Sequence, residues 1–80
     1  MMHVNIKFFA SLSEYTGLAE TTVAANSEAT VKDAWDLATG NRAMPDNTLC
    51  AINMDYARLD SRISDGDEVA FFPPVTGGCS

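Results

Sequence analysis

A single capped amphipathic helix at residues 30–40 most constrains how this chain can fold. Thr30 and Asp33 have the spacing of a capping box, which favours a helix start. Four apolar residues then recur at the spacing of one buried stripe: Val31, Ala34, Trp35 and Ala38. Gly40 is suited to end the helix. Because Trp35 lies in the middle of the stripe, it is predicted to be the main core anchor.

Two strands are expected before this helix. Residues 4–9 alternate, and three of them share the core face: Val4, Ile6 and Phe8. The alternation leaves Phe9 on the open face. Residues 10–16 predict a short helical turn whose Tyr15 folds back onto the core. The β-branched residues at 20–23 predict a returning strand, so the first two strands form a loose hairpin.

The part of the chain after the helix adds further strands. A polar loop at residues 41–47 leads to a strand at 48–53 and its turn at 53–56. Residues 57–63 contain at most a short edge strand. A tight turn at 65–67 then leads to the last strand at 68–72. In the last strand, Val69 and Phe71 face the core, whereas Ala70 and Phe72 face the other way.

This order of elements predicts an α+β fold, a mixed sheet with one main helix packed across one face. A right-handed crossover through the helix would place the last strand parallel to the first, in the middle of the sheet. That is the β-grasp arrangement of ubiquitin-like proteins. We expect a β-grasp domain at residues 1–74 and a flexible C-terminal tail at residues 75–80.

Charge and composition exclude several classes of partner. With 5 basic and 11 acidic residues the net charge is -6, which argues against nucleic acid and favours a partner with a basic docking face.

No apolar run is long enough to span a bilayer, and the start carries no signal-peptide pattern, so we expect a cytoplasmic protein. Cys50 is expected in the core, and no metal cluster or bound cofactor is expected.

The last ten residues combine an extended exit with two glycines that no turn or cap requires. Pro73 and Pro74 lack backbone donors, so they end the sheet ladder and favour an extended chain. Because they lack a Cβ, Gly77 and Gly78 could pass through a narrow channel in another protein and let the active site of that protein approach their carbonyls closely. On these residues alone, a plain flexible terminus is the simpler interpretation.

Two segments carry a resemblance to a known family. The stretch DGDEVAFFPPVTGG at residues 65–78 resembles the C-terminal signature of the small subunit of molybdopterin synthase, the MoaD-type sulfur carriers. The stretch KFFASL at residues 7–12, with Glu14, resembles the opening of the same family, and the resemblance covers nearly the whole chain.

The resemblance implies a co-substrate whose partners supply the catalysis. In that family, an enzyme related to ubiquitin-activating enzymes uses ATP and Mg to adenylate the terminal glycine, and a sulfur donor converts it to a thiocarboxylate. The large synthase subunit then receives the tail and uses its sulfur to build the molybdopterin dithiolene. Here the reactive carboxyl would belong to Gly78, with Gly77 giving access, while Val75 and Thr76 would contact the partner with the prolines.

Three aromatic residues are candidates for the docking face. By alternation, Phe9 and Phe72 fall on the sheet face opposite the helix, where exposed apolar side chains often mark an interface. Tyr56 is expected in a turn. It either joins the two phenylalanines on the docking face or is covered by a loop in a small hydrophobic cluster outside the main core. Pro73 and Pro74 continue this surface toward the tail.

The chain departs from the family pattern at two places. Cys79 and Ser80 follow the second glycine, so the Gly78 carboxyl is held in a peptide bond, and we expect a peptidase to remove both residues. A less simple alternative gives Cys79 its own role, as a persulfide carrier or an acceptor of the Gly78 acyl group. In addition, Ser13 occupies a position that is often basic in the family.

Other functions remain open from the sequence. The tail could serve a different thiocarboxylate pathway, such as one for thiamine or cysteine. From a different class, the chain could be a ubiquitin-like protein modifier or a noncovalent interaction module.

Overall fold

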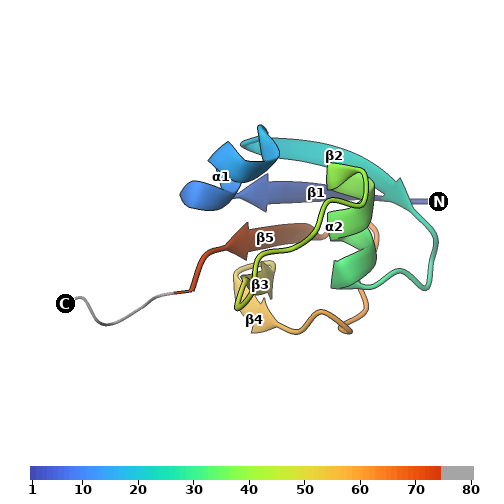
Figure 1. The fold of residues 1–80 in the computed structure, drawn as a ribbon. Helices are drawn as coiled ribbons and strands as arrows, with labels where there is room; N and C mark the ends of the chain where they lie inside the picture. Colours follow the sequence, from blue (N-terminus) through green and yellow to red (C-terminus); the bar gives the residue numbers. More distant parts are fainter. Residues whose placement is uncertain (75–80) are drawn as a thin grey trace.

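The structure is a computed structural model that describes residues 1–74. Its elements are β1 (Met2–Phe8), α1 (Ser11–Thr16), β2 (Glu20–Ala25), α2 (Val31–Thr39), β3 (Leu49–Ile52), β4 (Asp55–Ala57) and β5 (Glu68–Phe72). The five strands form one sheet in the order β2-β1-β5-β3-β4 (Figure 1). β1 and β5 are parallel in the middle of the sheet, and the other pairs are antiparallel. The predicted mixed sheet with a central last strand is therefore confirmed.

Helix α2 begins and ends where its capping residues predict. The backbone N–H of Thr30 donates to Asp33 Oδ2 at 3.0 Å, and the backbone N–H of Asp33 donates to Thr30 Oγ1 at 3.4 Å. Gly40 is left-handed with φ 70°, and its N–H donates to the carbonyl of Asp36. The capping box and the glycine stop are both confirmed.

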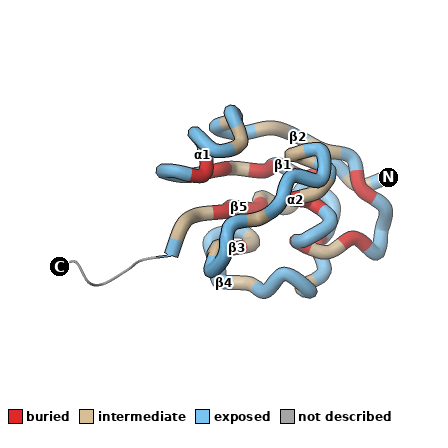
Figure 2. The backbone as a smooth tube through the Cα atoms, in the orientation of Figure 1, coloured by how far each residue is buried: buried red, intermediate tan, exposed pale blue. Residues whose placement is uncertain are grey.

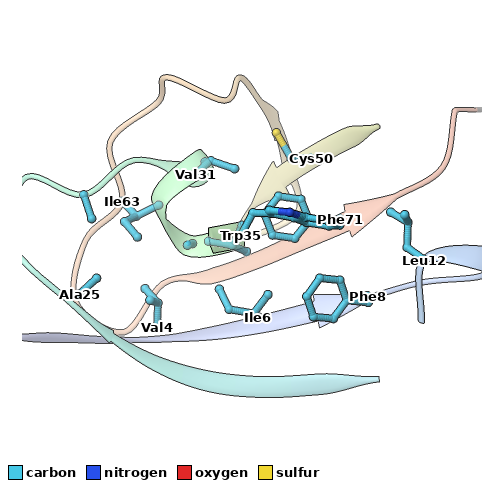
Figure 3. Close-up of a cluster of buried hydrophobic side chains, with 13 residues drawn as sticks. Val4, Ile6, Phe8, Leu12, Ala25, Val31, Trp35, Cys50, Ile63 and Phe71 are labelled. Carbon is cyan, nitrogen blue, oxygen red and sulfur yellow. The ribbon is translucent and has the colours of Figure 1, made fainter. Parts of the chain in front are cut away.

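The core lies between α2 and one face of the sheet, and Trp35 is at its centre (Figure 3). Trp35 is fully buried, and its ring packs edge-on against Phe8 and Phe71, with centroids 5.6 and 5.1 Å away. Its Nε1–H donates to the carbonyl of Arg42 at 2.6 Å. Because the indole has a hydrogen-bond acceptor, Trp35 can be buried completely.

Burial alternates along the central strands, as expected (Figure 2). Val69 and Phe71 of β5 are fully buried, whereas Ala70 and Phe72 are only partly covered. Cys50, predicted as a small core hydrophobe, is 3% exposed. The predicted faces of β5 are confirmed.

Tyr15 is a correction to the sequence-based prediction. Its side chain does not fold back onto the core but is 41% exposed. The Tyr15 hydroxyl donates to the carbonyl of Ala43 at 2.8 Å, and the guanidinium of Arg42 lies 5.2 Å from the ring centroid. The tyrosine therefore ties α1 to the loop at residues 41–47, because its hydroxyl finds a carbonyl there.

The hairpin after β3 is tighter than predicted. The turn consists of Asn53 and Met54 alone, both left-handed with φ 52° and 74°. Such a two-residue turn lets the next strand begin at once, so Tyr56 lies in β4 and not in the turn. The edge strand thus precedes residues 58–63, where Arg62 forms only an isolated bridge with Thr30.

Ala10 is expected to be a strained residue. It has φ 53° and ψ -132°, a region that L side chains rarely adopt. Replacing Ala10 with Gly should therefore raise the free energy of unfolding by about 1 kcal/mol. In the matched control, Ala24→Gly in the exposed part of β2 should lower it by about 0.5–1 kcal/mol. Urea denaturation of both variants checks this, and a destabilised Ala10→Gly chain would contradict the strain.

Candidate functional site

The chain leaves the sheet at the edge where β1 and β5 both end. β5 stops at Phe72, and Pro73 and Pro74 lead away from the body of the domain (Figure 1). The backbone N–H of Phe9 donates to the carbonyl of Phe71 at 3.0 Å, so Phe9 lies beside the end of β5. A central strand that is paired on both sides therefore forms the base of the exit.

An apolar groove covers the sheet face opposite α2, next to this exit. The rings of Tyr56 and Phe72 contact each other with centroids 5.9 Å apart, and Phe9 lies on the same groove. Tyr56 is 77% exposed and Phe9 is 48% exposed. The groove has a volume of about 380 Å³ and is lined by Lys7, Phe9, Ala51, Met54, Tyr56, Glu68, Ala70 and Phe72. The structure thus brings all three predicted aromatic residues together.

For Tyr56, the structure contradicts the alternative in which a loop covers the side chain. At 77% exposed, the side chain is not part of a small hydrophobic cluster covered by a loop within residues 1–74. Its partner across the hairpin is Ala51, so the ring stands on the open face with Phe72. Its role in docking stays a prediction.

Met54 is a groove residue that the sequence reasoning missed. It is 93% exposed at the hairpin turn and lines the apolar groove. The position of Met54 could have indicated an exposed apolar contact, since a large apolar residue stands where two-residue turns usually carry glycine.

An ion pair closes the apolar groove on its β1 side. Lys7 Nζ lies 2.9 Å from Glu68 Oε2. The pKa of Lys7 is raised because its ammonium donates a hydrogen bond to the Glu68 carboxylate and lies beside the negative charge of that group; the charge of Glu20 adds to the shift. Beyond the pair lies a second concavity, the polar hollow, with a volume of about 440 Å³; it is lined by Asn5, Lys7, Glu20, Thr21, Thr22 and Glu68. The open face is therefore divided into an apolar and a polar half.

The remaining predicted site residues lie outside the described residues: Val75, Thr76, Gly77, Gly78 and Cys79. Within residues 1–74, no three His, Cys, Asp or Glu side chains are grouped so that they could hold a metal ion. None of the helices described is long and apolar enough to cross a membrane.

Cys50 is expected to be chemically inert in the folded chain. Burial raises the pKa of its thiol, and the thiol donates to the carbonyl of Ala57 at 3.3 Å. Because the thiolate is the nucleophile, a neutral buried thiol reacts slowly at neutral pH. In a Cys79→Ser chain, where Cys50 is the only thiol, iodoacetamide should modify the protein only after urea unfolds it. Rapid labelling of the native chain would contradict this.

The mixed sheet, the helix across one face and the exit from a central strand define a ubiquitin-like β-grasp protein. Residues 6–78 match the model of the ThiS family, so the chain belongs to that family.

Relatives and solved structures agree with this assignment. The chain is 38% identical to the molybdopterin synthase sulfur carrier subunit of Escherichia coli, over 94% of this chain and 99% of that protein. It is 33% identical to small archaeal modifier protein 1 of Haloferax volcanii, over 90% and 97% of the two chains. The crystal structure of that modifier superposes with a TM-score of 0.81 at 31% identity, covering 94% of this chain and all of the other.

One chain of a two-subunit complex shares the fold. It belongs to the complex of subunits 1 and 2 of molybdopterin-converting factor from Helicobacter pylori, with a TM-score of 0.64 and 22% identity over 96% of this chain and 100% of that one.

Proposed function

We propose that this chain is a sulfur carrier for molybdopterin synthesis. In this proposal, Cys79 and Ser80 are removed, and the freed Gly78 carboxylate is adenylated and converted to a thiocarboxylate. The observation that carries it is the 38% identity to a molybdopterin synthase sulfur carrier subunit over 99% of that protein. The exit of the tail from a central strand, beside an exposed apolar groove, supports the same reading.

The proposed chemistry explains why the carrier needs an activating enzyme. A carboxylate is a poor electrophile, so ATP supplies AMP as a leaving group on the Gly78 carboxyl. Adenylation releases pyrophosphate. Sulfur that a donor delivers at the sulfide oxidation level then displaces AMP, and the thiocarboxylate that forms is a better nucleophile than water. The chain itself binds no cofactor in this scheme, because ATP and Mg belong to the activating partner. It acts as a co-substrate of the synthase.

The proposed partners divide between the two parts of the chain. The adenylating enzyme, the sulfur donor and the peptidase act on the tail, with Gly77 giving access to Gly78. The large synthase subunit takes the tail and docks on the apolar groove through Phe9, Tyr56 and Phe72. Exposed aromatic side chains gathered around a groove are the kind of surface that anchors a protein interface.

Complementation of a strain without its own carrier subunit tests the proposal. Three chains are compared: the full chain, the chain trimmed to end at Gly78, and the trimmed chain without Gly78. The trimmed chain should restore molybdopterin synthesis, the full chain should do so only where the peptidase is present, and the chain without Gly78 should fail. Restoration by the chain without Gly78 would overturn the proposal.

A second candidate function is protein modification. It is favoured by the likeness to small archaeal modifier protein 1, whose structure superposes with a TM-score of 0.81. A modifier would form isopeptide bonds between Gly78 and target lysines. Proteomic detection of such bonds in the native cell would support it, whereas rescue of molybdopterin synthesis by the trimmed chain supports the carrier. A thiocarboxylate carrier for another pathway would neither form isopeptide bonds with target lysines nor restore molybdopterin synthesis.

A further inference from the structure

Within residues 1–74, β2 presents a long edge of the sheet that no other strand pairs with. It is an outer strand in the order β2-β1-β5-β3-β4, and its Glu20–Ala25 span is twice as long as the three residues of the other outer strand, β4 (Figure 1). Helix α1 contacts β1 and β5. Unpaired backbone groups on such an edge are a template for another strand.

The register of β1 and β2 shows which backbone groups point outward. Hydrogen-bonded and non-hydrogen-bonded residue pairs alternate in an antiparallel ladder. Phe8 N–H donates to the carbonyl of Ala19 at 2.9 Å, so every second residue from there faces β1: Thr21, Val23 and Ala25. The N–H and carbonyl groups of Glu20, Thr22 and Ala24 therefore point away from the sheet. All three of these residues are exposed.

The polar hollow lies directly beside this edge and is negatively charged. Glu20 and Glu68 contribute two carboxylates, and Lys7, which is paired with Glu68 at 2.9 Å, contributes one ammonium. Within residues 1–74, Glu20 has no ion pair. Thr22 and Asn5 add polar oxygens, and the Thr22 hydroxyl donates to Asn5 Oδ1 at 3.0 Å. A cationic side chain is the complement of this surface.

We propose that the outer edge of β2 and the polar hollow form one docking site for an extended segment of a partner protein. The segment adds a strand to β2 through Glu20, Thr22 and Ala24, and it carries Lys or Arg at alternate positions. Side chains two residues apart share one face of a strand, so these cations project over the hollow. This site is separate from the apolar groove and does not depend on the proposed tail chemistry.

A second copy of this chain fits the edge less well than a basic partner. Each copy carries a net charge of -6, so two copies repel each other. A second copy would also bring no cation to the hollow from its own β2, where the single charged residue is Glu20.

Peptide titration of the full-length, ¹⁵N-labelled chain tests the proposal. The probe is a capped eight-residue peptide that alternates valine and lysine, and its matched control alternates valine and glutamate. With the lysine peptide at about ten times its Kd, amide exchange at Glu20, Thr22 and Ala24 should slow about tenfold. Added salt should weaken the binding, and the glutamate peptide should leave these amides unchanged.

Three variants separate the backbone contact from the charge contact. Thr22→Pro removes an outward N–H but no hydrogen bond to β1, and it should weaken peptide binding about tenfold, whereas Thr22→Ala should keep it. Glu20→Lys should weaken it about fivefold. If Thr22→Pro fails to fold, the amide exchange of the wild-type chain shows whether the peptide pairs with β2.

Three results would overturn the proposal. The first is equal binding of both peptides, or binding of neither. The second is a response of the lysine peptide at Phe9, Tyr56 and Phe72 in place of β2. The third is a dimer of the free chain that pairs through β2.

Discussion

A Phe72→Glu chain is expected to bind the large synthase subunit about 30-fold more weakly or worse, the loss typical of an interface hot spot. Phe72 is half-buried on the open face, where its ring contacts Tyr56 and lines the apolar groove. A carboxylate there would have to lose its hydration in the interface, and the one cation that lines the groove, Lys7, is already paired with Glu68 at 2.9 Å. Titration calorimetry with the separate large subunit measures the loss.

The fold should tolerate the Phe72 change. Because the side chain lies outside the core, the free energy of unfolding should fall by no more than about 1 kcal/mol. Leu37→Glu is the matched control, since Leu37 is a 51% exposed apolar residue on α2, across the sheet from the groove. It should leave binding unchanged. An unfolded Phe72→Glu chain would contradict the position of Phe72 outside the core, and equal losses of binding for the two variants would contradict docking at the groove.

A Trp35→Ala chain should lose about 3–5 kcal/mol of stability, the usual cost of removing a fully buried large aromatic side chain. Trp35 is 0% exposed and packs against both Phe8 and Phe71, so its loss leaves a cavity between α2 and the two central strands. Small domains are stable by only about 5–15 kcal/mol, so this change removes a large share of the total. The variant should be partly or wholly unfolded in dilute urea.

Circular dichroism in the far ultraviolet is the suitable measurement, because Trp35 is the only tryptophan and its loss removes the fluorescence signal. Leu37→Ala on the exposed side of the same helix should change stability by less than about 0.5 kcal/mol. A Trp35→Ala chain that unfolds within about 1 kcal/mol of the parent would contradict the central position of this residue.

Much of the fold followed from local pattern. The bounds of α2 were predictable because Thr30, Asp33 and Gly40 are capping residues with a direct hydrogen-bonding reason for their positions. β5 was predictable because Val69 and Phe71 alternate with less buried residues, and both are fully buried.

One error comes from a contact between distant segments, and the other comes from the geometry of a local turn. Tyr15 has the spacing of a core residue, but its hydroxyl bonds to a carbonyl 28 residues away, which no local pattern reveals. The sequence predicts Tyr56 in a turn because Asn53 and Asp55 both favour turns, whereas two left-handed residues, Asn53 and Met54, suffice to reverse the chain.

The open face was only partly predictable. Alternation placed Phe72 on it, but the contact between Phe72 and Tyr56 depends on the register of β3 with its two neighbours. The division of this face by the ion pair of Lys7 and Glu68 depends in the same way on the parallel pairing of β1 with β5. Register is a property of the assembled sheet, so composition and spacing could not supply it.

The intact mass of the protein from its native cells tests the sulfur-carrier proposal most directly. A chain that ends at Gly78 is expected, together with a second species in which one oxygen of that chain is replaced by sulfur. The sulfur should disappear when the purified large subunit and its substrate are added. A chain that retains Cys79 and Ser80 and carries no added sulfur, in cells that make molybdopterin with it, would contradict the sulfur-carrier proposal.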